Sequence, residues 1–360
     1  MDRRAHFGVS KLRPERVHAR LTPAWPLRLP RRQGPDGVLR VRGRLVERLL
    51  YIDDRPVIVR AWDEGADINL VADAVDPRLV ADAGRLPSAF GASPRPAQEG
   101  GDRRRARRPA GPATEPGVGN PDPKRPASRA HLERAIARMR FAFGIDDDLR
   151  PFYERFRDDP LLGPAIRHQP WGRPGRRPDP WEVLAWAVTE QLIEAPRAHA
   201  IQRRIVRRWG KSLDLQANVL RAPPGPELIA GRAPAELTAM DLAPSRAVSM
   251  VRAAREVAAG RADLSDPASD RRLLAIPGIG PWTVALVGLA GRGDPDALPA
   301  GDLAYIKVIG RLANLGRRAT VPEVEEFFRP YAPYRGLAGT FVLREHHKLV
   351  AAGPPLRIAA

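Results

Sequence analysis

The chain has 360 residues, 43% of them hydrophobic, and its 60 Lys and Arg exceed its 42 Asp and Glu by 18 positive charges. Such an excess favours a polyanionic partner such as nucleic acid. Cysteine is absent, which excludes disulfides, Cys-ligated zinc and Cys-held iron–sulfur clusters. Neither a membrane-spanning apolar run nor a secretion signal is recognised, so we expect a cytoplasmic protein with no membrane partner.

Residues 1–83 are predicted to form a small β-rich domain. The segment Leu39–Arg42 alternates apolar and basic residues with the period of a strand. Pro56–Trp62 is a short run rich in β-branched residues, and Asp53–Arg55 before it is typical of a turn. The sequence therefore predicts a mainly antiparallel sheet.

Residues 84–128 differ in composition, because they are crowded with Pro, Gly, Ala, Ser and Arg and include the run Arg103–Arg108. Such a segment cannot bury enough apolar surface to offset the entropy of ordering. We interpret it as a disordered basic linker, either solvated or in weak, nonspecific contact with DNA.

Residues 129–352 show helical periodicity. Apolar residues recur at three- and four-residue steps in the segment 132–143, and a second helix is expected from Trp181 until Pro196 breaks or kinks it. An all-α domain is predicted here. The complete chain is thus expected to be an α+β protein in which a small antiparallel sheet precedes a helical domain.

The most informative segment in the helical region is a tight turn, Pro277-Gly278-Ile279-Gly280. Arg271–Ile276 should end one helix, and Pro281 suits the first position of the next. The glycines permit positive φ and close backbone approach, so the backbone N–H groups of the turn can form an anion site. An ordinary corner between two helices is the alternative.

Two segments in sequence order resemble the helix-hairpin-helix DNA glycosylase superfamily, and within it the bacterial 3-methyladenine DNA glycosylase II family. They are Ile276–Thr283, which matches the hairpin, and Leu298–Leu303, which matches the catalytic loop. Val188–Ile193 resembles the Gln-Leu segment that wedges into DNA, and Leu242–Ala247 resembles the segment that leads toward the hairpin.

The resemblance implies that Asp302 is the catalytic carboxylate, which stabilises the positive charge that develops on the sugar and orients water. Its alternative role is that of a helix N-cap. Trp282 occupies the position where bifunctional relatives carry a Schiff-base Lys, so a monofunctional enzyme is expected. Its indole would stack on the flipped base, unless it is a core tryptophan.

The resemblance also assigns the DNA contacts and the base pocket. Leu192 is the candidate wedge that fills the space of the flipped nucleotide, with a helix-core leucine as the alternative. The other implied DNA contacts are Pro277, Gly278, Ile279, Gly280, Thr283 and Gln191. Leu286 and Leu343 line the implied base pocket with Trp282, at positions that are aromatic in the familiar relatives. His346 and His347 have no ligand spacing around them, so no metal site is predicted.

The sequence thus predicts a monofunctional DNA glycosylase that removes flipped-out alkylated bases, such as 3-methyladenine, in base excision repair. Two alternatives remain: a non-enzymatic helix-hairpin-helix DNA-binding protein, and a glycosylase for another damaged base. The expected partner is double-stranded DNA, bound by a monomer in the cytoplasm at the nucleoid. No cofactor is expected, other than a monovalent cation that the hairpin could hold.

Overall fold

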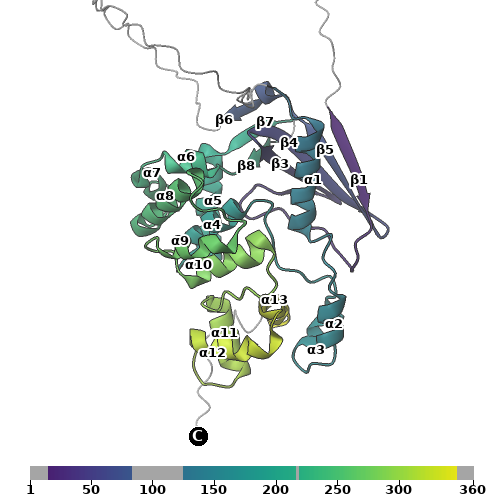
Figure 1. The fold of residues 1–360 in the computed structure, drawn as a ribbon, viewed down its shortest axis with the longest axis vertical. Helices are drawn as coiled ribbons and strands as arrows, with labels where there is room; N and C mark the ends of the chain where they lie inside the picture. Colours follow the sequence, from purple (N-terminus) through teal and green to yellow (C-terminus); the bar gives the residue numbers. More distant parts are fainter. Residues whose placement is uncertain (1–14, 83–124, 216–218, 347–360) are drawn as a thin grey trace, which may run out of the picture.

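The computed structural model describes residues 15–82, 125–215 and 219–346 (Figure 1). The segment predicted as a linker, residues 84–128, lies outside the described residues except for its last four. His347 also lies outside them.

The N-terminal part is a five-stranded antiparallel sheet with the strand order β1-β5-β4-β3-β2. Its strands are β1 (Arg16–Leu21), β2 (Arg40–Arg42), β3 (Leu45–Ile52), β4 (Arg55–Glu64) and β5 (Asp67–Ala74). Asp53 and Asp54, with φ of 48° and 60°, form the tight turn between β3 and β4. The strands and the turn predicted in this region are confirmed.

Successive side chains of a strand point to opposite faces of the sheet. Each face of this sheet is covered by a different element. Leu50 and Val57 face the helix α1 (Arg129–Phe143), which buries Leu132 and Ile136 against them. Leu49 and its neighbours on the other face contact a second, smaller sheet. The helix α1, which the sequence places with the helical domain, thus packs on the N-terminal sheet.

The second sheet has the order β6-β7-β8 and joins segments that are far apart in the chain. Its strands are β6 (Val80–Asp82), β7 (Lys211–Asp214) and β8 (Val219–Ala222). The described part of residues 129–352 is therefore mostly rather than entirely helical, and the all-α prediction is corrected there. The sequence did not indicate these short strands, because each has few apolar residues. Leu213 and Leu220 are buried only through their contact with the N-terminal sheet, which includes Leu49 of β3.

The remaining helices form two separate hydrophobic cores. The first core contains α4 (Pro180–Glu190), α5 (Ala195–Trp209), α6 (Pro226–Ala230), α7 (Pro234–Thr238), α8 (Pro244–Ala258), α9 (Asp270–Leu274), α10 (Pro281–Leu286) and the π-helical turn η3 (Val287–Arg292). The second contains α2 (Arg150–Phe156), α3 (Leu162–His168), α11 (Leu303–Leu312), α12 (Val321–Phe328) and α13 (Arg335–Glu345). In Figure 1 the second group lies at the end of the molecule remote from the sheet. The predicted fold class, an antiparallel sheet followed by a mostly helical region, is confirmed.

Candidate active site at the hairpin

The predicted hairpin is present, with α9 before the turn and α10 after it. Ile276 and Ile279 are buried in the first core and anchor the turn there. Gly278 has φ +86°, and a Cβ built on it would lie 2.4 Å from the hydroxyl oxygen of Ser249 on α8. That hydroxyl lies 2.6 Å from the carbonyl oxygen of Pro277. Glycine is therefore required at position 278 both for its backbone conformation and for close packing on α8.

Gln191 ties the end of α4 to the hairpin. Its Nε2 lies 2.8 Å from the carbonyl oxygen of Gly278 and 3.1 Å from the hydroxyl oxygen of Thr283, and donates to both. Thr283 is itself buried. Arg246 donates to the carbonyl oxygen of Gln191 at 2.7 Å from the other side. Gln191 and Thr283, both predicted to contact DNA, thus hold the turn together in this structure.

Leu192 follows immediately and projects into solvent. It has φ +55° and is 101% exposed, and α4 has already ended at Glu190. The alternative that Leu192 is a helix-core leucine is therefore wrong. An apolar side chain displayed on a short segment, which Gln191 fastens to the hairpin, has the placement that a wedge needs.

Asp302 is the N-cap of α11, and its carboxylate accepts hydrogen bonds at both oxygens. Oδ1 accepts from the backbone N–H of Ala304 at 2.8 Å, and Oδ2 accepts from the indole Nε1 of Trp282 at 3.2 Å. Trp282 belongs to the first core's α10, whereas α11 belongs to the second core. The N-cap role and proximity to Trp282 therefore occur together, and the site lies where the two cores meet.

Trp282 is half-buried and stands beside the loop that precedes Asp302. A Cβ built on Gly301 would lie 3.5 Å from the Cβ of Trp282, which shows how closely the two pack. The indole N–H is used by Asp302, and Trp282 as a whole is only partly buried. Stacking of its ring on a flipped base stays a prediction.

The charge of Asp302 acts on two further ionisable groups, Glu190, to which the sequence assigned no role, and Tyr305, which it named only as possible aromatic surface. Burial raises the pKa of Glu190, and the charge of Asp302 acts in the same direction. The carboxylate of Glu190 also accepts a hydrogen bond from Gln202 at 2.9 Å. Burial likewise raises the pKa of Tyr305, with a further increase from Asp302. The only signal in the sequence was that Glu190 directly precedes Gln191.

The comparisons with known proteins agree with this geometry. The chain is 28% identical to the DNA-3-methyladenine glycosylase of Bacillus subtilis (strain 168) over 226 residues, which are 61% of this chain and 75% of the relative. A 3-methyladenine DNA glycosylase from Archaeoglobus fulgidus superposes with a TM-score of 0.63 at 19% identity, over 86% of this chain and 89% of that one. In sequence and in fold, the chain is thus similar to DNA glycosylases of the helix-hairpin-helix type.

Other similar proteins share a smaller part of their length or a lower identity with this chain. A probable bifunctional transcriptional activator/DNA repair enzyme AlkA of Mycobacterium tuberculosis is 29% identical over 209 residues, which are 56% of this chain but only 41% of that protein. The structure of MBOgg1 bound to a low-affinity DNA ligand has a TM-score of 0.56 at 17% identity, over 86% of this chain and 98% of that one. No model of a known protein family matches the chain.

The two leucines assigned to the predicted base pocket lie on different cores. Leu286 is one turn after Trp282 on α10 and packs against the first core, and Leu343 on α13 packs against the second. Only Trp282, of the three pocket residues, contacts Asp302 through a hydrogen bond among the described residues. The base pocket as a whole stays a prediction.

Within the residues that the structure describes, no group of three or more His, Asp and Glu side chains is arranged to hold a metal ion. Across the same residues, no helix has the length and apolar content that a membrane crossing requires.

Proposed function

We propose that this protein is a monofunctional DNA glycosylase that hydrolyses the N-glycosidic bond of flipped-out alkylated bases such as 3-methyladenine. The observation that carries the proposal is the carboxylate of Asp302, fixed by two donors beside a hairpin whose backbone suits phosphate binding. The names of the relatives in Bacillus and Archaeoglobus support the same substrate class.

In this proposal the hairpin holds the DNA backbone and Leu192 enters the stack as the nucleotide leaves it. Unstacking a base costs a few kcal/mol, and an apolar side chain that fills the vacated space offsets part of this. The left-handed backbone at Leu192 turns its side chain away from the first core and into solvent. The free protein therefore already presents the wedge.

Asp302 then acts on the sugar. As the bond to the base lengthens, positive charge develops on the sugar, and a nearby carboxylate stabilises it. Each oxygen of Asp302 uses one lone pair for a protein donor, so each retains capacity for a water molecule or the sugar. The two donors fix the orientation of the carboxylate before DNA arrives.

Trp282 supports two parts of the proposal. Its indole ring can stack on a base and attracts a cationic one, such as an N-alkylated purine. An alkylated base of this kind is a good leaving group, so no dedicated acid is needed. Because Trp282 has no amine, it cannot form the Schiff base required for strand cleavage, and base release alone is expected.

The deciding experiment measures free base released from methylated duplex DNA by wild type and by Asp302→Asn. Asn is also a good N-cap, so the variant should fold normally while base release falls by about 10²- to 10⁴-fold. Asp266→Asn is the matched control, because Asp266 caps a short helix through the same contact, 2.8 Å to Ala268 N. That variant should release base at the wild-type rate.

Four results would contradict the proposal. An equally active Asp302→Asn variant would remove the catalytic role. Absence of base release by wild type from a panel of methylated, etheno-adducted, deaminated and oxidised bases would leave a DNA-binding protein without catalysis. Release of only deaminated or oxidised bases would show a glycosylase of another specificity. Strand cleavage without alkali or heat would contradict monofunctional chemistry.

A further inference from the structure

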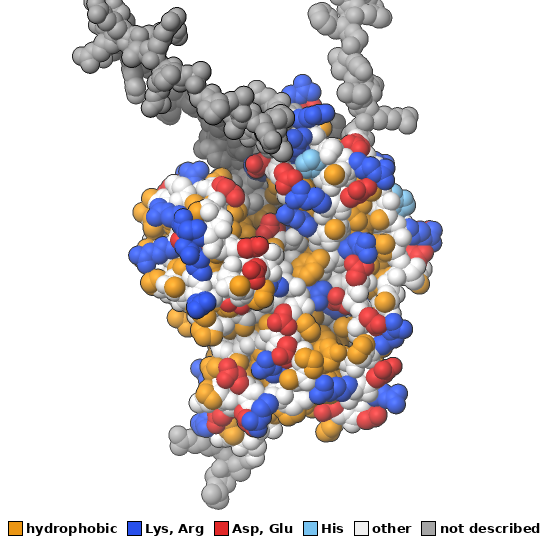
Figure 2. Space-filling view, viewed as in Figure 1, with side chains coloured by type: hydrophobic (Ala, Val, Ile, Leu, Met, Phe, Trp, Pro, Cys, Tyr) orange, Lys and Arg blue, Asp and Glu red, His pale blue; other side chains and the backbone are white. Residues whose placement is uncertain are grey.

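An arginine-rich hollow of about 880 Å³ lies beside the hairpin, between α8 and α9. Ile276 and Pro277, the first residues of the turn, form part of its wall. Five arginines and one glutamate line it, which leaves four net positive charges around one opening. In Figure 2, Lys and Arg side chains gather at the edge of the molecule where Figure 1 places α7 and α8.

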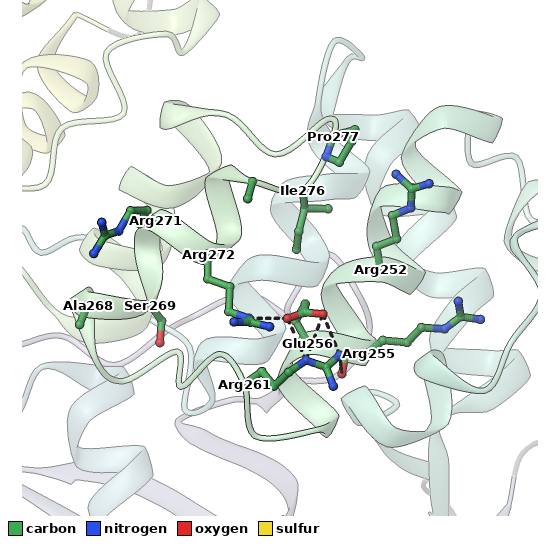
Figure 3. Close-up of a pocket in the computed structure, with 11 residues that line it drawn as sticks. Arg252, Arg255, Glu256, Arg261, Ala268, Ser269, Arg271, Arg272, Ile276 and Pro277 are labelled. Carbon is green, nitrogen blue, oxygen red and sulfur yellow. Dashed lines mark hydrogen bonds and ion pairs between the residues drawn. The ribbon is translucent and has the colours of Figure 1, made fainter.

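Three of the side chains that line the hollow, Arg261, Arg272 and Glu256, form ion pairs with one another. Arg261 and Arg272 both donate to the carboxylate of Glu256, as Figure 3 shows, with 2.7 Å between Arg261 Nη2 and Glu256 Oε1. These hydrogen bonds, that of Arg261 first, lower the pKa of Glu256 to about 2. This triad is ionised throughout the physiological range and neutralises one of its own two positive charges.

The arginines of the rim are not neutralised in this way. Arg252 and Arg271 are exposed on opposite sides of the hollow and form no ion pair or hydrogen bond within residues 15–82, 125–215 and 219–346 (Figure 3). Among the described residues, Arg255 donates only to a backbone carbonyl, that of Ala230. An anion that enters the hollow would therefore meet positive charges that no described carboxylate neutralises.

The hollow is connected to the hairpin through α8. Ser249, which contacts Pro277, and Arg252 are three residues apart and lie on neighbouring positions of one helix face. A DNA strand carries a negative charge at every nucleotide. A strand whose phosphate is held at the turn therefore carries further phosphates a few nucleotides along, and these can reach the arginines of the hollow.

We propose that the hollow between α8 and α9 is a second phosphate-binding site, which holds the DNA backbone a few nucleotides from the phosphate at the hairpin. The proposal rests on the proposed function for the presence of DNA at the hairpin. It extends that function, because it assigns part of the affinity for DNA to arginines that do not contact the reacting nucleotide.

The first experiment measures DNA affinity as a function of salt concentration for wild type and for Arg252→Ala/Arg271→Ala. Each lost phosphate contact should lower the slope of log K against log salt by about 1, so the double variant should lose about 2. The single-turnover rate of base release at saturating DNA should stay unchanged. Arg252→Lys/Arg271→Lys should retain most of the slope, because the charge remains.

The matched control is Arg32→Ala/Arg208→Ala, which removes the same charge at two exposed arginines that do not line the hollow. An equal loss of slope in this control would overturn the proposal, because nonspecific attraction would then explain the effect. An unchanged slope in Arg252→Ala/Arg271→Ala, with an unchanged melting temperature, would overturn it as well.

A second experiment locates the contact on the DNA. Single uncharged methylphosphonate linkages are placed in turn along each strand of a duplex with a central abasic-site analogue. For wild type, a position outside those next to the lesion should weaken binding, and that position should become silent in Arg252→Ala/Arg271→Ala. If no such position exists, the proposal is wrong. This experiment measures binding and not base release. The proposal of a second phosphate site can therefore be confirmed even where the proposed glycosylase activity is absent.

Discussion

The N-terminal sheet and the hairpin region both contain many arginines, but they use them differently. On the sheet, Arg60 lies 3.0 Å from a Glu47 carboxylate oxygen and 2.6 Å from one of Asp73, which is also paired with Arg16. Figure 2 shows acidic and basic side chains next to one another over much of this part. Around the hairpin, Arg252 has no acidic partner within the described part of the chain.

This difference shows that the net charge of a protein does not locate its binding surface. A paired arginine contributes to folding and is largely unavailable to a phosphate, whereas an unpaired one is available at once. The same division applies to other groups: Asp36 is enclosed by its partners, while Leu192 is fully exposed. Enclosed groups should affect stability, and exposed groups should affect DNA binding and base release.

The largest effect on stability is expected for Asp36→Asn. The Asp36 side chain is buried, and its Oδ2 lies 2.6 Å from Arg177 Nη1 and 3.1 Å from the indole Nε1 of Trp186. Loss of the charge leaves Arg177 without its partner in a low-dielectric setting, which costs about 3 kcal/mol. Urea unfolding should show this loss, while base release per folded molecule stays unchanged.

The pH dependence of this effect has a defined sign. Burial alone would raise the pKa of Asp36, but the positive charges of Arg177 and Arg48 outweigh it and the pKa is lowered. A lowered pKa in the folded state stabilises the protein above the ordinary aspartate value of about 3.9, and this is lost as the pH falls through the lowered value. The difference between wild type and variant should therefore shrink in acid.

The exposed pair of Asp241 and Arg197 provides the control for Asp36. Asp241→Asn should cost no more than about 1 kcal/mol, because water screens exposed ion pairs. Equal losses in the two variants would break the proposed division between enclosed and exposed groups.

Leu192→Ala should produce the next largest effect, and only on function. The side chain is fully exposed in the free protein and buries no apolar surface, so its removal should not lower the melting temperature. Base release from a normally paired lesion should decrease roughly 10-fold, which corresponds to about 1.4 kcal/mol of lost support for the flipped state. Single-turnover rates on duplex DNA measure this.

If Leu192 acts as a wedge, a second result is expected for Leu192→Ala. The defect should become smaller when the lesion is in single-stranded DNA, where less stacking has to be replaced. Leu79→Ala, at another leucine that is 65% exposed, should release base at the wild-type rate. A defect of the same size on single-stranded DNA would exclude the wedge role.

Glu190→Gln should give the smallest effect, a gain in stability of roughly 0.5 kcal/mol at neutral pH. Since burial raises the pKa of Glu190, the stability associated with its neutral form is complete below the ordinary value of about 4.3 and is lost as the pH rises through the raised value. The advantage of Gln should therefore grow as the pH rises above about 4.3. Glu325→Gln, on an exposed part of α12, should show no such trend in thermal unfolding.

The sequence predicted local features well, because they depend on neighbouring residues. The turn at Pro277–Gly280, the helix that buries Leu132, and the strand over Pro56–Trp62 follow from periodicity and turn chemistry, and the structure confirms them. The position of Asp302 at a helix start was also readable, since Asp is favoured there.

Features that depend on contacts between distant segments were not predictable in this way. The hydrogen bonds of Gln191 to the hairpin join residues 87 and 92 positions apart, and β6 pairs with β7 from a distant part of the chain. Which arginines are unpaired is likewise decided by the fold. A run of sequence shows how many charges are present, but not which of them have partners.

The hydrogen bond between Trp282 and Asp302 joins side chains that belong to two separately packed cores. Its geometry therefore depends on both cores being in place at the same time. We therefore expect loosening of either core on heating to disturb the site, even where the other core is intact.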